Sequence, residues 1–103
     1  MTTFIDDDGK VRKIFYLNDS NSFSRYDHQH DRREFDIPHA WYADFPMNNK
    51  VNLMEIVYIC DRTTGEMFAC RVIELCDRTP IKGPHFIARE LRRWKPTATD
   101  ATV

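Results

Sequence analysis

Glycine is scarce in this 103-residue chain, and long apolar runs are absent from it. Its three glycines and five prolines form no linker-like or low-complexity stretch. No segment approaches the roughly 18 uninterrupted apolar residues that a membrane-spanning helix requires. Residues 1–8 also lack the basic start and apolar core of a secretory signal. We therefore expect an intracellular, cytoplasmic protein with no membrane partner.

The cysteines form no recognisable motif. Cys60, Cys70 and Cys76 are an odd number, all within apolar segments, and no CxxC spacing for zinc or redox chemistry occurs. A secreted domain of this size more often carries an even set of disulfides. We expect reduced, buried thiols that act as small core residues, and we expect no cofactor.

Catalytic motifs are missing as well. No serine lies in the context of a hydrolase nucleophile elbow, and no glycine-rich loop is present to hold a phosphate. The three thiols lie in hydrophobic segments, where burial raises a thiol pKa. The sequence therefore predicts a non-enzymatic protein.

The clearest positive signal is an apolar hairpin made of residues 51–60 and 66–76. A turn that contains Gly65 joins the two runs, and this glycine is expected at positive φ, in the bulge that often follows a type I turn. If Asp61 faces Glu66, the cross-strand neighbours are 57 and 70, 59 and 68, and 56 and 71. Both faces are then mostly apolar, which is typical of strands in the middle of a sheet.

The flanking segments complete a single domain over residues 1–96. Residues 10–17 have the β-favouring composition of a strand, and 24–34 are polar without periodicity, which indicates a long loop or an irregular edge. One short strand is expected around Ile37 or around Trp41. The tail, residues 97–103, is small and polar, and we expect it to be disordered.

A helix is predicted over residues 84–94. Pro84 suits the first helical position, and Ile87, Leu91 and Trp94 fall on one stripe at 100° per residue. The predicted fold is therefore α+β and β-rich: a small antiparallel sheet or partly closed barrel built on the central hairpin, with this helix over one face or end. A chain this short has few other elements to cover both hairpin faces, so a homodimer is a further expectation.

An aromatic segment between two prolines is the leading candidate for a binding surface. Trp41, Tyr42 and Phe45 lie within five residues, and such side chains in rigid loops are good interface anchors. Charged neighbours that would set the orientation of the partner are Asp44, Arg32 and Arg33. The alternative is that Trp41 or Phe45 is a core residue.

Nucleic-acid binding is a second hypothesis. Residues 82–95 carry five basic residues against Glu90, a local charge of +4 in a chain whose net charge is −1. On the predicted helix Arg89, Arg92 and Arg93 form one face, and Lys95 lies nearby. RNA or single-stranded DNA would contact these basic side chains through phosphates. The alternative is a solvated face.

A metal-dependent activity at His28 and His30 is a third hypothesis. On an extended segment these two imidazoles project to the same side, a spacing that can chelate a divalent ion. No third ligand has motif spacing, so we assign no metal ligand.

The preferred interpretation is a small protein-binding regulator or inhibitor that docks on a larger protein machine, a type that includes phage- and virus-encoded inhibitors.

Overall fold

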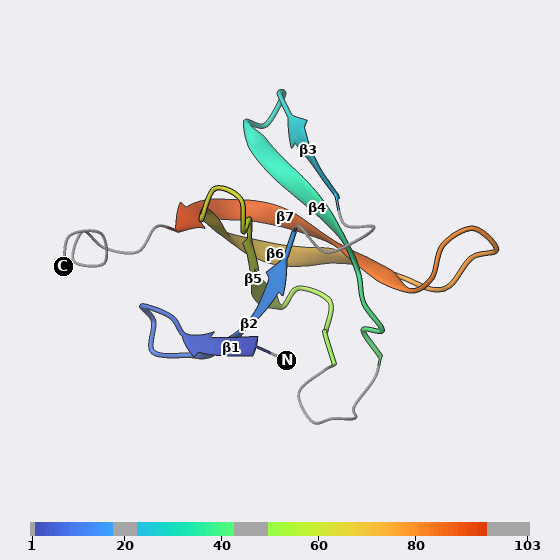
Figure 1. Cartoon of the computed structure of the whole chain (residues 1–103), viewed down its shortest axis with the longest axis horizontal. Coiled ribbons are helices and arrows are strands. Elements are labelled where there is room, and N and C mark those ends of the chain that lie inside the picture. Colours follow the sequence, from blue (N-terminus) through green and yellow to red (C-terminus); the bar gives the residue numbers. More distant parts are fainter. Residues whose placement is uncertain (1, 18–22, 43–49, 95–103) are drawn as a thin grey trace.

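Seven strands form one sheet in the computed structural model, which describes residues 2–17, 23–42 and 50–94 (Figure 1). Across those ranges no helix forms, and so none is long and apolar enough to cross a membrane. The strand order is β1-β2-β5-β6-β7-β4-β3. The strands are β1 (Thr2–Ile5), β2 (Val11–Tyr16), β3 (Phe23–Asp27), β4 (Arg32–Pro38), β5 (Ile56–Cys60), β6 (Met67–Cys76) and β7 (His85–Trp94).

The sheet is mixed rather than antiparallel. Strands β2 and β5 pair in parallel, while every other pairing is antiparallel. Between them the chain builds the β3–β4 hairpin at the far edge of the sheet, so that β5 enters beside β2 in the same direction. Because the order ends at β1 on one side and at β3 on the other, the sheet is open and not a closed barrel.

The sheet is strongly curled around its core. The rings of Phe15 in β2 and Phe86 in β7 lie 5.0 Å apart at their centroids, although two strands separate β2 from β7. In a flat sheet these strands would be about 14 Å apart, at roughly 4.8 Å per step. The sheet therefore curls enough for side chains of β2 and β7 to meet over its concave face. The core lies on this face and consists of Phe15, Phe35, Ile37, Val51, Val57, Ile59, Phe68, Cys70, Val72, Phe86 and Ala88.

The central hairpin has the predicted register. Val57 pairs with Cys70, Ile59 with Phe68 and Ile56 with Arg71, and both strands lie inside the sheet. Gly65 has a φ of 79°, as the turn requires. The first strand begins at Ile56 rather than near residue 51, because residues 52–55 form a turn in which Met54 has a φ of 71°.

One further expectation about strands is corrected, and another is confirmed at one of its two proposed sites. Residues 24–34 contain the β3–β4 hairpin, where a loop or irregular edge was expected, and β3 is an edge strand. Pairing with β7 orders β4, so the polar composition of the hairpin did not decide its conformation. Of the two sites proposed for a short strand, Ile37 lies in β4 and Trp41 lies in a turn. The predicted tail, residues 97–103, lies outside the described residues.

The predicted C-terminal helix is wrong, because residues 85–94 form strand β7. This strand pairs along one side with β4 and along the other with β6. Phe86 and Ala88 are fully buried on the concave face, so contacts with two neighbouring strands outweigh the helical spacing of the apolar residues. Register shifts in the β6–β7 ladder, one of them between Ala69 and Cys70, interrupt the alternation that would otherwise reveal the strand.

Candidate functional site

Trp41 is part of the structural framework. It packs against the core cluster, and its Nε1–H donates to the carbonyl oxygen of Cys76 at 2.9 Å. Two residues earlier, the backbone N–H of His39 donates to the carbonyl oxygen of Pro84 at 3.0 Å. The 39–41 segment therefore bonds to both ends of the connection between β6 and β7. We call this connection, residues 77–84, the β6–β7 arm.

Tyr42 extends the segment to the surface. Its ring packs edge-to-face on Trp41 with 5.4 Å between centroids, and the residue is 53% exposed. Trp41 thus holds Tyr42 in place while Tyr42 remains available for contact. The other two members of the predicted segment, Asp44 and Phe45, lie outside the described residues.

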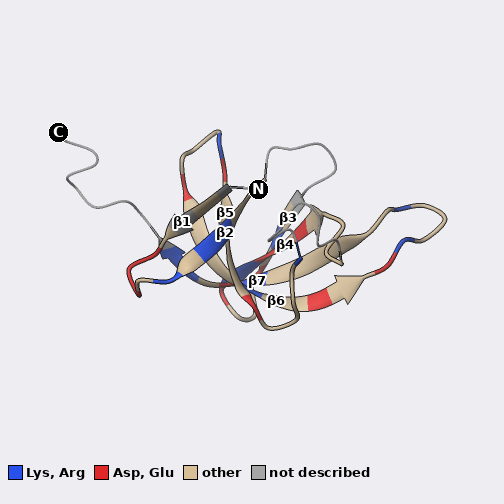
Figure 2. Cartoon of the chain, turned by 90° about the horizontal axis from the view of Figure 1, so that it is seen from below, with Lys and Arg blue, Asp and Glu red and all other residues tan. Residues whose placement is uncertain are grey.

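The β6–β7 arm projects from the body of the sheet and ends in an ordered turn (Figure 1). The Thr79 hydroxyl accepts hydrogen bonds from the backbone N–H groups of Ile81 and Lys82, and the Thr79 N–H donates to the Lys82 carbonyl. This turn displays Ile81, which is 97% exposed, the most exposed of the large apolar side chains described. Figure 2 shows charged residues on both legs of the arm and none at its tip.

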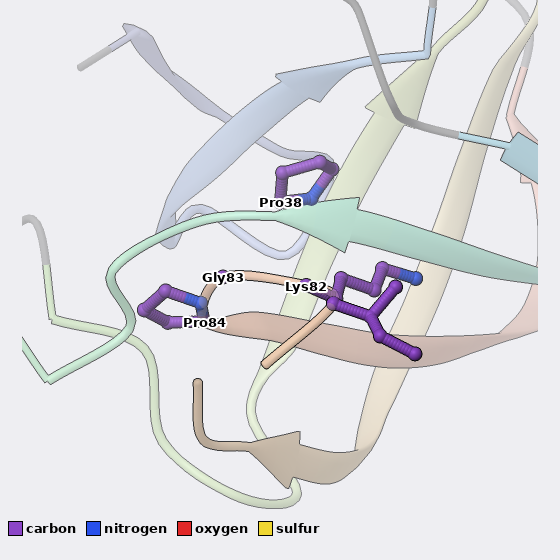
Figure 3. Close-up of a pocket in the computed structure, with 5 residues that line it drawn as sticks. Pro38, Lys82, Gly83 and Pro84 are labelled. Atoms are coloured by element: carbon purple, nitrogen blue, oxygen red, sulfur yellow. The ribbon is translucent and has the colours of Figure 1, made fainter. Parts of the chain in front are cut away.

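A hollow of about 490 Å³ lies at the inner side of this tip. It is lined by Pro38, Ile81, Lys82, Gly83 and Pro84, and Figure 3 shows Pro38 of β4 across from Gly83 and Pro84 of the arm. The ammonium group of Lys82 forms an ion pair with Asp36 at 2.7 Å. The lining that remains is more apolar than polar. We call the surface formed by Tyr42, this hollow and Ile81 the arm surface.

The structure does not bring Arg32 and Arg33 to the arm surface. Both residues begin β4, at the tip of the β3–β4 hairpin, whereas Trp41 follows the opposite end of that strand (Figure 1). They are therefore not rim residues of the surface around Tyr42.

The predicted basic face is divided between the two sides of β7. Arg92 pairs across from Ala69 and donates to the Tyr58 hydroxyl at 3.2 Å, while Arg93 pairs across from Phe68 and lies over its ring on the concave face. Lys95 lies outside the described residues.

Each of the three arginines also has a carboxylate partner. Arg89 pairs with Glu34 at 2.8 Å, Arg92 with Asp7 at 3.0 Å, and Arg93 with Glu66 at 3.2 Å. In Figure 2 acidic and basic segments alternate over the described sheet. A phosphate would therefore compete with protein carboxylates for these side chains.

His28 and His30 lie in the turn of the β3–β4 hairpin and not on an extended segment. The His30 Nδ1 is 2.7 Å from Asp27 Oδ2, an interaction that lowers the pKa of Asp27, and the His28 ring packs on Tyr26. Among the described residues no group of three or more histidine, cysteine or acidic side chains is placed to hold a metal ion.

The three thiols are free, and none is activated. Burial raises the pKa of Cys60 and raises that of Cys70 much further. Burial, together with a hydrogen bond to Glu74, raises the pKa of Cys76 to about 11. These thiols are therefore protonated at neutral pH, and a protonated thiol is a poor nucleophile.

Sequence reasoning missed Ile81. This residue, which lies between the predicted hairpin and the predicted helix, was given no role. A lone isoleucine between Pro80 and Pro84 in an otherwise polar turn was the available signal.

Comparisons with protein-family models, with curated protein sequences and with solved structures gave no match for this chain.

Proposed function

We propose that this protein is a non-enzymatic protein-binding module, of the regulator or inhibitor type, that docks through its arm surface on a larger protein. The observation that carries the proposal is the 97% exposure of Ile81 on a turn that is already ordered by Thr79. An ordered turn loses little conformational entropy on binding, so the burial of its apolar tip counts almost fully toward affinity.

The partner that fits this surface is a folded protein with an apolar pocket for Ile81. Removing an isoleucine side chain from water contributes about 1.5–3 kcal/mol, which corresponds to roughly tenfold to a hundredfold in affinity. Tyr42 adds an amphipathic ring at the base of the arm, and the proline-lined hollow accepts an apolar side chain from the partner. Trp41 acts indirectly, because it holds Tyr42 and the arm.

The experiment is affinity capture with the purified protein from a lysate of cells that express it, after nuclease treatment. Wild-type protein is compared with Ile81→Ser and Tyr42→Ala, and bound proteins are quantified by mass spectrometry. We expect a discrete protein that wild type retains and that both variants lose by about tenfold or more.

The matched control is Leu91→Ser. Leu91 is also an exposed apolar residue, at 46%, but it lies in the part of β7 remote from the arm. It is expected to retain the captured protein at the wild-type level. Equal capture by wild type, Ile81→Ser and Tyr42→Ala would contradict the proposal.

Nucleic-acid binding through Arg89, Arg92, Arg93 and Lys95 is the alternative, and it has less support because each described arginine of this set has a carboxylate partner. It predicts bound material that nuclease removes and that salt displaces steeply.

The free cysteines agree with a reducing, cytoplasmic location, which remains part of the proposal.

A further inference from the structure

Arg33 is in an unusual position for an arginine. Its guanidinium lies near two aromatic rings, with Cζ 5.9 Å from the centroid of Tyr26 and 5.9 Å from that of Phe68. The Nε atom is buried and has no hydrogen-bond partner among the described residues. A buried donor without a partner costs about 1–3 kcal/mol, more when the group is charged.

Three other arginines in this part of the structure have carboxylate partners. Arg25 and Arg89 pair with Glu34, and Arg93 pairs with Glu66. Apart from strand pairing, the one hydrogen bond of Arg33 within the described part of the chain is donated by its backbone N–H to Glu90 Oε1 at 2.9 Å. Its guanidinium therefore donates no hydrogen bond within the described chain, and its Nε is buried as well.

The Arg33 side chain borders a hollow of about 150 Å³ at the open end of the curled sheet, by the β5–β6 turn and far from the arm surface. The other lining residues are Leu17, Ser24, Phe35, Asp61, Thr64, Glu66 and Phe68. This volume is sufficient for a carboxylate or phosphate group. The Ser24 hydroxyl, for which no hydrogen bond is found in the described ranges, is a second donor there.

The two carboxylates of this hollow are largely engaged. Asp61 Oδ1 accepts hydrogen bonds from the backbone N–H groups of Thr63 and Thr64. Glu66 accepts a hydrogen bond from the Thr64 hydroxyl and pairs with Arg93. Their negative charge weakens anion binding, but neither carboxylate forms an ion pair with Arg33, the only basic residue of this lining, in the described structure.

We propose that this hollow is a binding site for an oxyanion group, a carboxylate or a phosphate, held by the Arg33 guanidinium with help from the Ser24 hydroxyl. A planar guanidinium binds either group through paired charge-assisted hydrogen bonds, and the ring of Phe68 fixes its orientation. The proposal is independent of docking through the arm surface.

The test is an NMR titration of the full chain with acetate and, separately, with methyl phosphate, at constant ionic strength. The probe is the Arg33 Nε–Hε signal, because the buried Nε–H exchanges slowly. We expect a saturable shift of this signal with at least one of the two anions, and the two titrations show which oxyanion chemistry is preferred. A signal that does not shift, or that shifts linearly without saturation, would overturn the proposal.

Variants assign the effect to Arg33. Arg33→Gln should weaken anion binding by about tenfold or more, as read from the backbone amides of residues 24 and 64, since charge-assisted hydrogen bonds are lost. Arg25→Gln is the matched control, because Arg25 lies in the same hairpin and is committed to Glu34. Unchanged binding in Arg33→Gln would also overturn the proposal. If that variant does not fold, Arg33→Lys takes its place. Lysine keeps the charge but lacks the paired N–H donors of the guanidinium, so we expect an intermediate weakening of anion binding.

Discussion

Replacing Trp41 by phenylalanine and by alanine separates its two structural roles. Phenylalanine keeps much of the packing against the core but removes the hydrogen bond from Nε1 to the Cys76 carbonyl. A single hydrogen bond of this kind contributes about 1 kcal/mol. We therefore expect Trp41→Phe to lower the free energy of unfolding by about 1 kcal/mol.

Trp41→Ala removes the packing as well. A fully buried tryptophan costs roughly 3–5 kcal/mol when it is truncated to alanine, and Trp41 is only partly buried. We expect a loss of about 2–4 kcal/mol, in addition to a displaced Tyr42 ring.

The assay is urea unfolding at neutral pH, followed by circular dichroism. Tyr42→Ala is the comparison variant, because it removes an exposed neighbouring ring and should change stability by no more than about 0.5 kcal/mol. If Trp41→Ala unfolds at the wild-type urea concentration, Trp41 is a surface residue and the reasoning about the arm is refuted.

Three further predictions concern the fold. A double-mutant cycle with Phe15→Leu and Phe86→Leu should give a coupling energy of about 0.5–1.5 kcal/mol in urea unfolding, because the rings meet across the curled sheet; strictly additive effects would contradict the curl. Gly65→Ala should destabilise by roughly 1–2 kcal/mol because its φ is positive, whereas Gly83→Ala, which has no such φ, should not; equal thermal midpoints would refute this. Hydrogen bonds from its arginine partners hold the pKa of Glu34 below 4.5, so its stabilising contribution is complete above pH 4.5 and lost as the pH falls; the stability advantage of wild type over Glu34→Gln should therefore shrink between pH 7 and pH 3.

The hairpin at the centre of the sheet could be predicted because its local signals agree. The apolar runs, the turn and Gly65 all specify the same register, and that register is observed. Strand β7 could not be predicted in the same way. Its burial depends on pairing with both β4 and β6. The register shift near Glu90 and Leu91 also interrupts the alternation of buried and exposed residues by which a strand is recognised in a sequence.

The candidate site was predicted only in part. The aromatic segment was singled out as a binding surface, and that role stays a prediction. The choice between core and surface for Trp41 depends on its hydrogen bond to Cys76, a contact between residues 35 positions apart. The exposure of Ile81 likewise follows from the projection of the arm, which no local pattern specifies. The division of Arg92 from Arg93 follows from β7 being a strand, because neighbouring residues of a strand face opposite sides.

The most direct test of docking through the arm surface is site-specific photocrosslinking in cells. Benzoylphenylalanine replaces Tyr42, a change that keeps an aromatic ring at the base of the arm, and the matched control carries it at Tyr26, an exposed tyrosine at the other end of the sheet. We expect a discrete crosslinked protein from position 42, absent from position 26 and lost when Ile81→Ser is added. Crosslinks of equal yield from both positions, or none from position 42, would contradict a docking role for the arm surface.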